Sequence, residues 1–183
     1  VAGLDGCLAR FEGDSSLSRR PRRRVAEPLR RMGARIDFEG AEGHEGLPMR
    51  VSGAHLASTH LVNTHASAQV KGAVLLAGLA SGVAVTVEEP HASRDHSERM
   101  LRARGVALEV RTLDTGSTLI ALDPSQRLAP LDITVPSDPS SVTFFAALAA
   151  LADEGELWFD DVCLNPTRTG AFDVLQRMGA DFA

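Results

Sequence analysis

One short polar stretch precedes a long apolar run of the 183-residue chain. Residues 65–72 read His-Ala-Ser-Ala-Gln-Val-Lys-Gly, and residues 73–80 after them are almost entirely apolar. If the run is helical, Ser67 and Gln69 lie in its first turn, beside backbone N–H groups without a partner inside the helix. This end of a helix attracts anions. A simpler interpretation stays open, in which Ser67 only caps the helix and Gln69 completes the turn.

An arginine recurs ahead of the predicted helices. Arg20, Arg94 and Arg168 follow one another at intervals of 74 residues. Because a guanidinium group matches phosphate and carboxylate in a two-pronged geometry, these positions indicate anion binding. Residues 19–31 contain seven arginines, most of which we expect on a solvated helix face. Arg20 differs from them because the repeat places it just ahead of its helix.

Other kinds of site find little support. The spacing of His65, His91 and His96 matches no common zinc-ligand pattern. The Gly-x-Ser-x-Gly motif of serine nucleophiles and the glycine-rich phosphate-binding motifs are absent from the sequence. The residues therefore act as binding groups for anions, without an obvious pair for proton transfer. We expect no metal and no cofactor.

Composition narrows the class of protein. The formal net charge is −5 and 44% of the residues are hydrophobic, which fits a globular protein and gives no case for nucleic acid or an anionic membrane as a partner. Cys7 and Cys163 show no disulfide or zinc pattern. No apolar run reaches membrane-spanning length. We expect a cytoplasmic protein, and a piece of a longer one, because the chain lacks an initiator methionine and starts and ends inside predicted elements.

Hydrophobic periodicity predicts alternating strands and helices. Helices are expected over residues 21–32, 66–79, 94–104, 139–151 and 169–178. Strands are expected over residues 35–38, 48–51, 84–88, 107–112, 118–122, 133–135 and 156–160, and from residue 180. Residues 1–11 fit a strand or a loop. Pro28 lies inside the first helix and should bend or weaken it.

The elements form an internal repeat of 74 residues. The sequence Arg-Met-Gly-Ala stands at residues 31–34 and again at residues 177–180, and Ser67 and Ser141 each open an apolar helix. The repeated amphipathic helices close at a glycine: Gly33, Gly105 and Gly179. The predicted unit is strand–helix–strand–helix–strand–strand, present partly, then fully, then partly again.

The polarity of the elements indicates which layer is buried. The helices at residues 66–80 and 142–151 are apolar nearly all round, so we expect them to be buried on most sides. The strand at residues 107–112 carries a charge on every second residue, which is typical of a sheet with one wet face. The sequence thus predicts a mixed α/β (α+β) protein with helices inside and sheets outside.

Several motifs, each weak alone, occur together in one order and spacing. They are Gly13-Asp14, Arg20-Pro21, Ala66-Ser67-Ala68-Gln69-Val70-Lys71, Ser93-Arg94-Asp95-His96, Pro136-Ser137-Asp138-Pro139-Ser140-Ser141 and Asn165-Pro166-Thr167-Arg168-Thr169-Gly170. Together they closely resemble the EPSP synthase (3-phosphoshikimate 1-carboxyvinyltransferase) family, in the bacterial class whose helix begins with Ala-Ser-Ala-Gln. The resemblance implies an inside-out α/β barrel of the enolpyruvyl transferase type, built from βαβαββ repeats.

The resemblance also implies where the chain lies in such an enzyme. Residues 1–136 correspond to the later part of the N-terminal domain, with a partial repeat at 1–52 and a full repeat at 53–136. Residues 137–183 correspond to the first, incomplete repeat of the C-terminal domain.

Enzymes of this family move the enolpyruvyl group of phosphoenolpyruvate to the 5-hydroxyl of shikimate 3-phosphate by addition and then loss of phosphate, without a cofactor. The resemblance implies that Ser67, the backbone at Ala68, and Arg94 bind shikimate 3-phosphate. It also implies that Arg20 binds phosphoenolpyruvate and that Gln69 contacts both substrates. The family's acid–base groups have no counterpart in this chain, so we expect no catalytic residue here. The parent enzyme is expected to be a monomer.

Two alternatives stay open. One is a related transferase that acts on UDP-N-acetylglucosamine, although the motifs at residues 67–69 and 93–96 argue against it. The other is a non-catalytic phosphoshikimate-binding fragment. Ser141 and Arg168 are interpreted as structural, with Thr143 at the position equivalent to Gln69.

Overall fold

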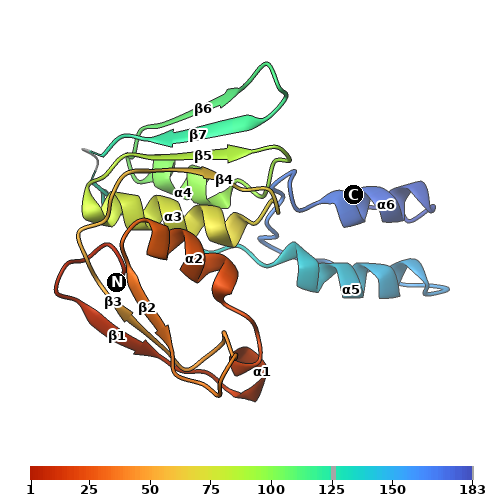
Figure 1. Ribbon diagram of the computed structural model, residues 1–183. Coiled ribbons are helices and arrows are strands. Elements are labelled where there is room, and N and C mark those ends of the chain that lie inside the picture. The colour runs from red at the N-terminus through yellow and green to blue at the C-terminus, as the bar shows by residue number, and fades with distance from the viewer. Residues whose placement is uncertain (125–126, 183) are drawn as a thin grey trace. The chain divides into compact units, whose positions relative to one another are not determined.

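The structure consists of two compact units. The computed structural model describes residues 1–124 and 127–182, and the chain divides into Val1–Pro130 and Leu131–Ala183 (Figure 1). The candidate site lies in the larger unit, which contains most of the regular secondary structure. The predicted domain boundary near residue 136, taken from the family resemblance, stays a prediction.

The larger unit contains two small sheets. The first has the order β1 (Leu8–Phe11), β3 (Met49–Ser52) and β2 (Arg35–Phe38), with both pairs antiparallel. The second has the order β4 (Thr59–Val62), β5 (Val85–Glu89), β7 (Thr118–Leu122) and β6 (Leu108–Thr112). Strands β4 and β5 are parallel, and the other pairs of this sheet are antiparallel. Parallel neighbours need a crossover connection, which α3 (Ala68–Ser81) supplies.

Helix α3 is the centre of this unit. It lies between the two sheets and packs against α2 (Arg23–Arg31) and α4 (His96–Ala103) (Figure 1). Val74 and Leu75 of α3 are 1% and 0% exposed. The prediction of an apolar helix buried on most sides is therefore confirmed for residues 66–80. A further short helix, α1 (Ser15–Ser18), precedes α2.

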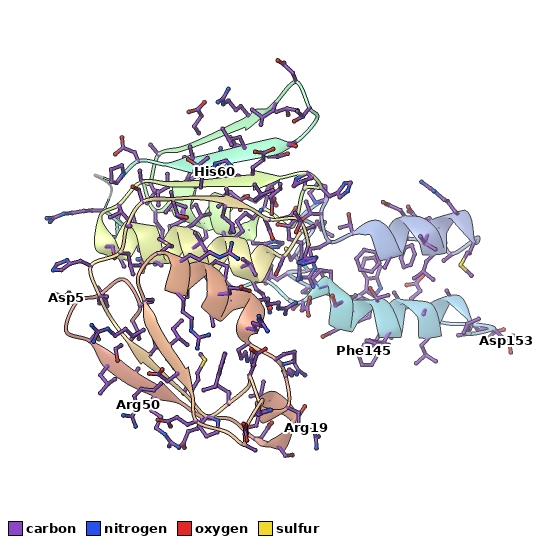
Figure 2. All side chains as sticks on the ribbon, in the orientation of Figure 1. Asp5, Arg19, Arg50, His60, Phe145 and Asp153 are labelled. Atoms are coloured by element: carbon purple, nitrogen blue, oxygen red, sulfur yellow. The ribbon has the colours of Figure 1, made fainter. Side chains whose placement is uncertain are left out.

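The two sheets turn a polar face outward. In β3, Val51 is buried whereas Arg50 is exposed on the outer side of the three-stranded sheet (Figure 2). In β6, Glu109 and Arg111 are exposed while Leu108 is buried. The expected order of layers, with helices inside and sheets outside, is what this unit shows.

The glycines that mark the repeat share one backbone conformation. Gly33, Gly105 and Gly179 have φ angles of 111°, 80° and 103°. Each follows an amphipathic helix, and residues with a Cβ rarely adopt this region. The three glycines therefore end equivalent helices in the way that the 74-residue spacing predicts.

The smaller unit differs from several predictions. It contains α5 (Pro139–Ala150) and α6 (Gly170–Arg177), and its strand-like pairing among the described residues is a single parallel bridge between Ser137 and Val162. The strands predicted at residues 133–135, at 156–160 and from 180 are wrong for this structure. A strand is stable only when a neighbour pairs with its backbone groups, and periodicity cannot reveal whether that neighbour is present.

Helix α5 is also more exposed than expected. Phe144 and Leu151 are 79% and 84% exposed, and only Pro139 and Ala146 of the helix are buried. The prediction that residues 142–151 are buried on most sides is therefore wrong here. In addition, Asp138 caps α5 by accepting a hydrogen bond from the Ser140 N–H, so Ser141 lies inside the helix and does not open it.

Other differences are small. Sequence patterning gave no range for β4, a four-residue strand without clear alternation. The helix predicted over residues 21–32 spans 23–31 and continues through Pro28, and the helix predicted over residues 94–104 spans 96–103.

The contact between α3 and β5 leaves no room for a side chain at Gly78. A Cβ added there would lie 2.2 Å from Cγ2 of Val85, which is fully buried. We expect Gly78→Ala to lower the free energy of unfolding by about 1–3 kcal/mol, because overpacking forces neighbouring groups apart. Urea denaturation of the complete protein measures this. Gly170→Ala in α6 is the control, since nothing lies within 4 Å of its added Cβ; equal stability of the two variants would contradict the prediction.

Candidate substrate-binding site

The N-terminus of α3 is built around Ser67. Its side chain accepts a hydrogen bond from the Val70 N–H at 3.4 Å and so caps the helix. Ala66, just before it, has a φ of 47°, a left-handed conformation that is unfavourable for a residue with a Cβ. The cap interpretation is thus correct, and a strained turn presents the Ser67 hydroxyl at the positive end of the helix.

A buried amide holds this turn in place. Asn63 ends β4 and is 5% exposed. Its Nδ2 donates to the Ser67 carbonyl at 3.1 Å, its Oδ1 accepts from the Ser67 N–H at 3.3 Å, and its backbone carbonyl accepts from the Ala66 N–H at 3.2 Å. We call residues 63–67 the Ser67 loop. Its conformation depends on the orientation of one side chain.

The single lysine of the chain lies below this loop, inside the protein. Lys71 is 1% exposed, and its Nζ lies 3.0 Å from Oε2 of Glu89 and 2.7 Å from Oε1 of Glu98. Both carboxylates are buried as well, at 1% and 4% exposure. Sequence reasoning missed this ion triad. The available signal was a lysine in the second turn of a helix that is otherwise apolar.

Glu89, at the end of β5, is the most connected member of the triad. Besides Lys71, it accepts hydrogen bonds from Asn63 Nδ2 at 2.7 Å, from the Ser93 hydroxyl at 2.7 Å and from the Ser93 N–H at 3.1 Å. Burial raises the pKa of Glu89, but the two hydrogen bonds from Ser93 and the Lys71 ammonium outweigh it. The net result is a pKa below the ordinary value of 4.5, so the carboxylate is charged at neutral pH.

A cationic pocket adjoins the Ser67 loop. Its volume is about 840 Å³, and Arg20, Ser67 and Gln69 all line it. Other cationic or titratable residues of the lining come from the start of α2 and the loops beside it: Arg22, Arg23, Arg24, Arg31, Glu27, Glu45 and His65. The structure therefore brings together three of the five predicted site residues.

Arg24 fixes the orientation of Gln69 in this pocket. Its Nη2 donates to Oε1 of Gln69 at 2.6 Å. With the amide oxygen engaged in this way, the Nε2 group of Gln69 is left to donate to a ligand. The short α2–α3 contact is one that spacing along the sequence does not reveal.

Arg94 lies elsewhere on the same framework. It is exposed and does not line the cationic pocket. It belongs to residues 90–95, which we call the Arg94 loop and which connect β5 to α4. Its neighbour Ser93 is bound to Glu89, so the Arg94 loop and the Ser67 loop share one buried carboxylate.

The three repeated arginines differ in their partners. Within residues 1–124 and 127–182, neither Arg20 nor Arg94 forms an ion pair, whereas Arg168 donates to Asp138 at 2.5 Å and to Ser140 at 2.6 Å. Arg168 is thus engaged by its own unit. An arginine without a carboxylate partner keeps its donors free for an anionic ligand.

A model of the EPSP synthase (3-phosphoshikimate 1-carboxyvinyltransferase) family matches residues 1–183. The chain belongs to this family. The 3-phosphoshikimate 1-carboxyvinyltransferase of Bacillus subtilis is 49% identical over 168 residues, which are 92% of this chain and 38% of the relative. The enzyme of the same name from a Synechococcus strain is 46% identical over 99% of this chain and 40% of its own length.

A solved EPSP synthase structure has the same fold. The Acinetobacter baumannii enzyme superposes with a TM-score of 0.76 at 40% identity, covering 98% of this chain and 39% of that structure. The chain thus spans about two fifths of the EPSP synthases that it matches, and the inside-out α/β barrel predicted from the sequence is the fold of this family.

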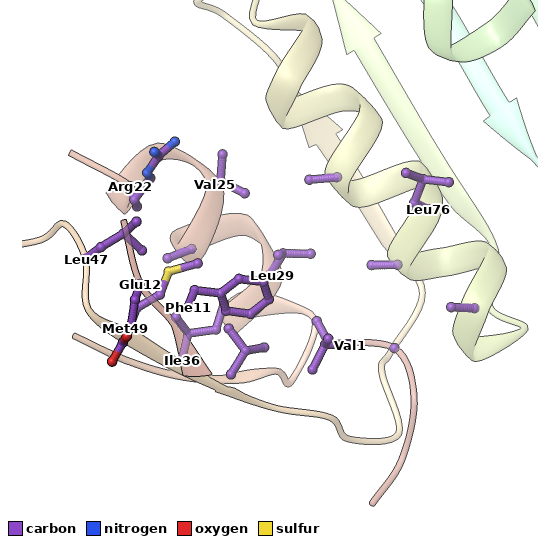
Figure 3. Close-up of a pocket in the computed structure, with 17 residues that line it drawn as sticks. Val1, Phe11, Glu12, Arg22, Val25, Leu29, Ile36, Leu47, Met49 and Leu76 are labelled. Carbon is purple, nitrogen blue, oxygen red and sulfur yellow. The ribbon is translucent and has the colours of Figure 1, made fainter. Parts of the chain in front are cut away.

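The larger unit contains a second cavity, which is apolar. It has a volume of about 440 Å³ and lies between α2, the three-stranded sheet and α3, with Phe11 and Leu29 on one side and Leu76 on the other (Figure 3). Anionic substrates such as those of the EPSP synthases need cations and hydrogen-bond donors, so the cationic pocket is the better candidate site.

Two further features were sought in the described part of the chain. No group of three or more His, Cys, Asp or Glu residues there is arranged to hold a metal ion. None of the helices there has both the length and the hydrophobicity to cross a bilayer.

Replacing the buried cation should strongly destabilise the protein. We expect Lys71→Met to lower the free energy of unfolding at pH 7 by about 3–5 kcal/mol, because two buried carboxylates lose their counter-charge. Since the folded pKa of Glu89 is lowered, its contribution in the parent protein is present above pH 4.5 and is lost as the pH falls through that lowered pKa. The deficit of the variant should therefore shrink below pH 4.5.

Urea denaturation of the complete protein across this pH range measures both effects. The matched control is Arg111→Met, which removes an exposed cation on the outer sheet and should change stability by about 0.5 kcal/mol or less. A loss below about 1 kcal/mol for Lys71→Met, or a deficit that grows in acid, would contradict this account of the triad.

Proposed function

We propose that the complete protein transfers the enolpyruvyl group of phosphoenolpyruvate to the 5-hydroxyl of shikimate 3-phosphate, and that this chain supplies part of the substrate site. Ser67, the backbone at Ala68, and Arg94 bind shikimate 3-phosphate in this proposal. Arg20 binds phosphoenolpyruvate, and Gln69 contacts both substrates. The family membership of the chain supports the reaction, and the geometry of the larger unit supports the roles of the residues.

One observation carries the proposal. Arg20, which has no ion-pair partner among the described residues, lines the same pocket as Ser67 and Gln69 at the N-terminus of α3. The pocket therefore combines a free guanidinium, a hydroxyl, an amide and the positive end of a helix. Substrates that each carry a phosphate group match this set of donors.

The first turn of α3 supplies backbone donors. The N–H groups of Val70 and Lys71 are occupied by the Ser67 hydroxyl and the Ser67 carbonyl. The N–H groups of Ala68 and Gln69 precede them and have no acceptor inside the helix. These two groups, with the hydroxyl proton of Ser67, are suited to a phosphate or a substrate hydroxyl. The backbone at Ala68 thereby gains a physical basis for its proposed role.

The proposed residues bind and orient, and they do not move protons. Arginine does not give up its proton at neutral pH, and Ser67 has no neighbouring base among its contacts. Their contribution to the reaction is to hold two anions together, which lowers the entropic barrier to their meeting and offsets their mutual repulsion.

Loss of either shikimate 3-phosphate ligand should weaken that substrate. We expect Ser67→Ala and Arg94→Ala each to raise the dissociation constant by about 10- to 100-fold, the loss expected for a hydrogen bond to a charged group. Isothermal titration of the complete protein with shikimate 3-phosphate measures this. Arg35→Ala, which removes an exposed arginine of the outer sheet, is the control and should bind like the parent.

Unchanged affinity in both site variants would overturn their assignment. Heat on titration with UDP-N-acetylglucosamine, and none with shikimate 3-phosphate, would replace the proposed reaction with that of the related UDP-sugar transferase.

Arg20 is assigned to the other substrate. In the presence of saturating shikimate 3-phosphate, we expect Arg20→Ala to raise the KM for phosphoenolpyruvate by about 10- to 100-fold, because a charge-assisted contact to the anion is lost. Steady-state kinetics of the complete protein measure this, with Arg19→Ala as the neighbouring control. A large rise in the KM for shikimate 3-phosphate with none for phosphoenolpyruvate would contradict the assignment.

A further inference from the structure

We propose that Glu89 is a positioning residue that couples the Ser67 loop to the Arg94 loop, so that the two loops are ordered together to receive one ligand. Naming that ligand as shikimate 3-phosphate rests on the proposed function above. The coupling itself rests only on the contacts of Glu89 with Asn63, Ser93 and Lys71.

The carboxylate of Glu89 is fully used. An ionised carboxylate offers about four acceptor positions. Oε1 accepts from Asn63 Nδ2 and from the Ser93 hydroxyl, and Oε2 accepts from Lys71 Nζ and from the Ser93 N–H. The four donors belong to three separate segments of the chain. None of them can move freely without leaving a buried acceptor unsatisfied, which is costly.

One branch leads to the Ser67 loop. The Asn63 amide donates to Glu89 and to the Ser67 carbonyl through the same Nδ2, while its Oδ1 accepts from the Ser67 N–H. Glu89 can only accept, so it fixes which end of the amide faces it. A reversed amide would place its oxygen against the carboxylate and would release Ser67. The left-handed turn at Ala66 therefore depends on the charge of Glu89.

The other branch leads to the Arg94 loop. Ser93 gives both its N–H and its hydroxyl to Glu89, which pins the residue next to Arg94 from two directions. Arg94 itself has no ion-pair partner among the described residues, so its guanidinium is positioned through the backbone at Ser93. Loss of Glu89 removes both anchors at once.

Lys71 and Glu98 make this coupling rigid. Lys71 joins Glu89 on β5 to Glu98 on α4, and all three side chains are buried. Oε2 of Glu98 is buried with no hydrogen-bond partner in the described part of the chain, so the triad retains an uncompensated acceptor. Buried charge of this kind adds little net stability compared with an apolar core, and its retention favours a role in orienting neighbouring groups.

The isosteric substitution Glu89→Gln isolates this role. An amide has one acceptor end and one donor end. Whichever way it turns, its NH₂ group faces two of the four donors, so at least one loop must detach. We expect the dissociation constant for shikimate 3-phosphate to rise at least tenfold, the effect of losing one hydrogen bond to a charged group.

Glu88→Gln is the matched control. Glu88 is the adjacent residue of β5, is only partly buried, and lies beside His60 at 3.5 Å. It makes none of the contacts to the two loops described above, so its variant should bind like the parent. Equal affinities of the parent and Glu89→Gln proteins would overturn the inference while leaving the proposed function intact.

A double-mutant cycle across the two loops separates coupling from general weakening. Asn63→Ala and Ser93→Ala each remove one branch and leave Glu89 in place. If Glu89 couples the loops, the double variant should bind shikimate 3-phosphate several-fold better than the product of the two single losses predicts. Losses that simply multiply would show independent loops and would overturn the inference.

Amide hydrogen exchange of the ligand-free complete protein tests the coupling without any substrate. In Glu89→Gln, residues 63–70 and residues 91–95 should both exchange about tenfold faster than in the parent, because both loops lose an anchor. Glu88→Gln should leave both segments unchanged. Faster exchange in one segment only, or in neither, would overturn the inference, and this result is independent of which substrate the protein binds.

Discussion

The buried ammonium of Lys71 is the constraint on which the arrangement of the site depends. A lone charge at this depth would be very costly, so the ammonium requires the two carboxylates of Glu89 and Glu98 beside it. Glu89 in turn requires donors on its remaining lone pairs, and Asn63 and Ser93 provide them. Satisfying one buried cation thereby ties a helix, a strand and two loops into one hydrogen-bonded unit.

This unit explains how three copies of one repeat serve different ends. The 74-residue spacing gives each copy an arginine before an amphipathic helix that ends at a left-handed glycine. In the smaller unit Arg168 is held by Asp138, which removes it from ligand binding. Arg20 and Arg94 have no such partner among the described residues. Equivalent positions in the repeats are therefore structural in one copy and available for an anion in the others.

Much of this was predictable from local patterns, and the failures have definite causes. The apolar residues of α3, the closing glycines and the alternating outer strands are local signals, so the helices and both sheets of the larger unit could be predicted. The strands predicted after residue 131 failed because a strand depends on a partner that periodicity does not report. The ion triad of Lys71 joins residues 18 and 27 positions apart, and no local pattern reveals such a contact. The short motifs did predict the EPSP synthase family, because their order carries information that each lacks alone.

The most direct test of the account is a crystal structure of the complete protein with shikimate 3-phosphate bound. The account predicts that the Ser67 hydroxyl and the Arg94 guanidinium both contact the same ligand molecule, with the four contacts of Glu89 retained beneath it. A ligand that is bound away from the N-terminus of α3, or that contacts only one of the two loops, would contradict it.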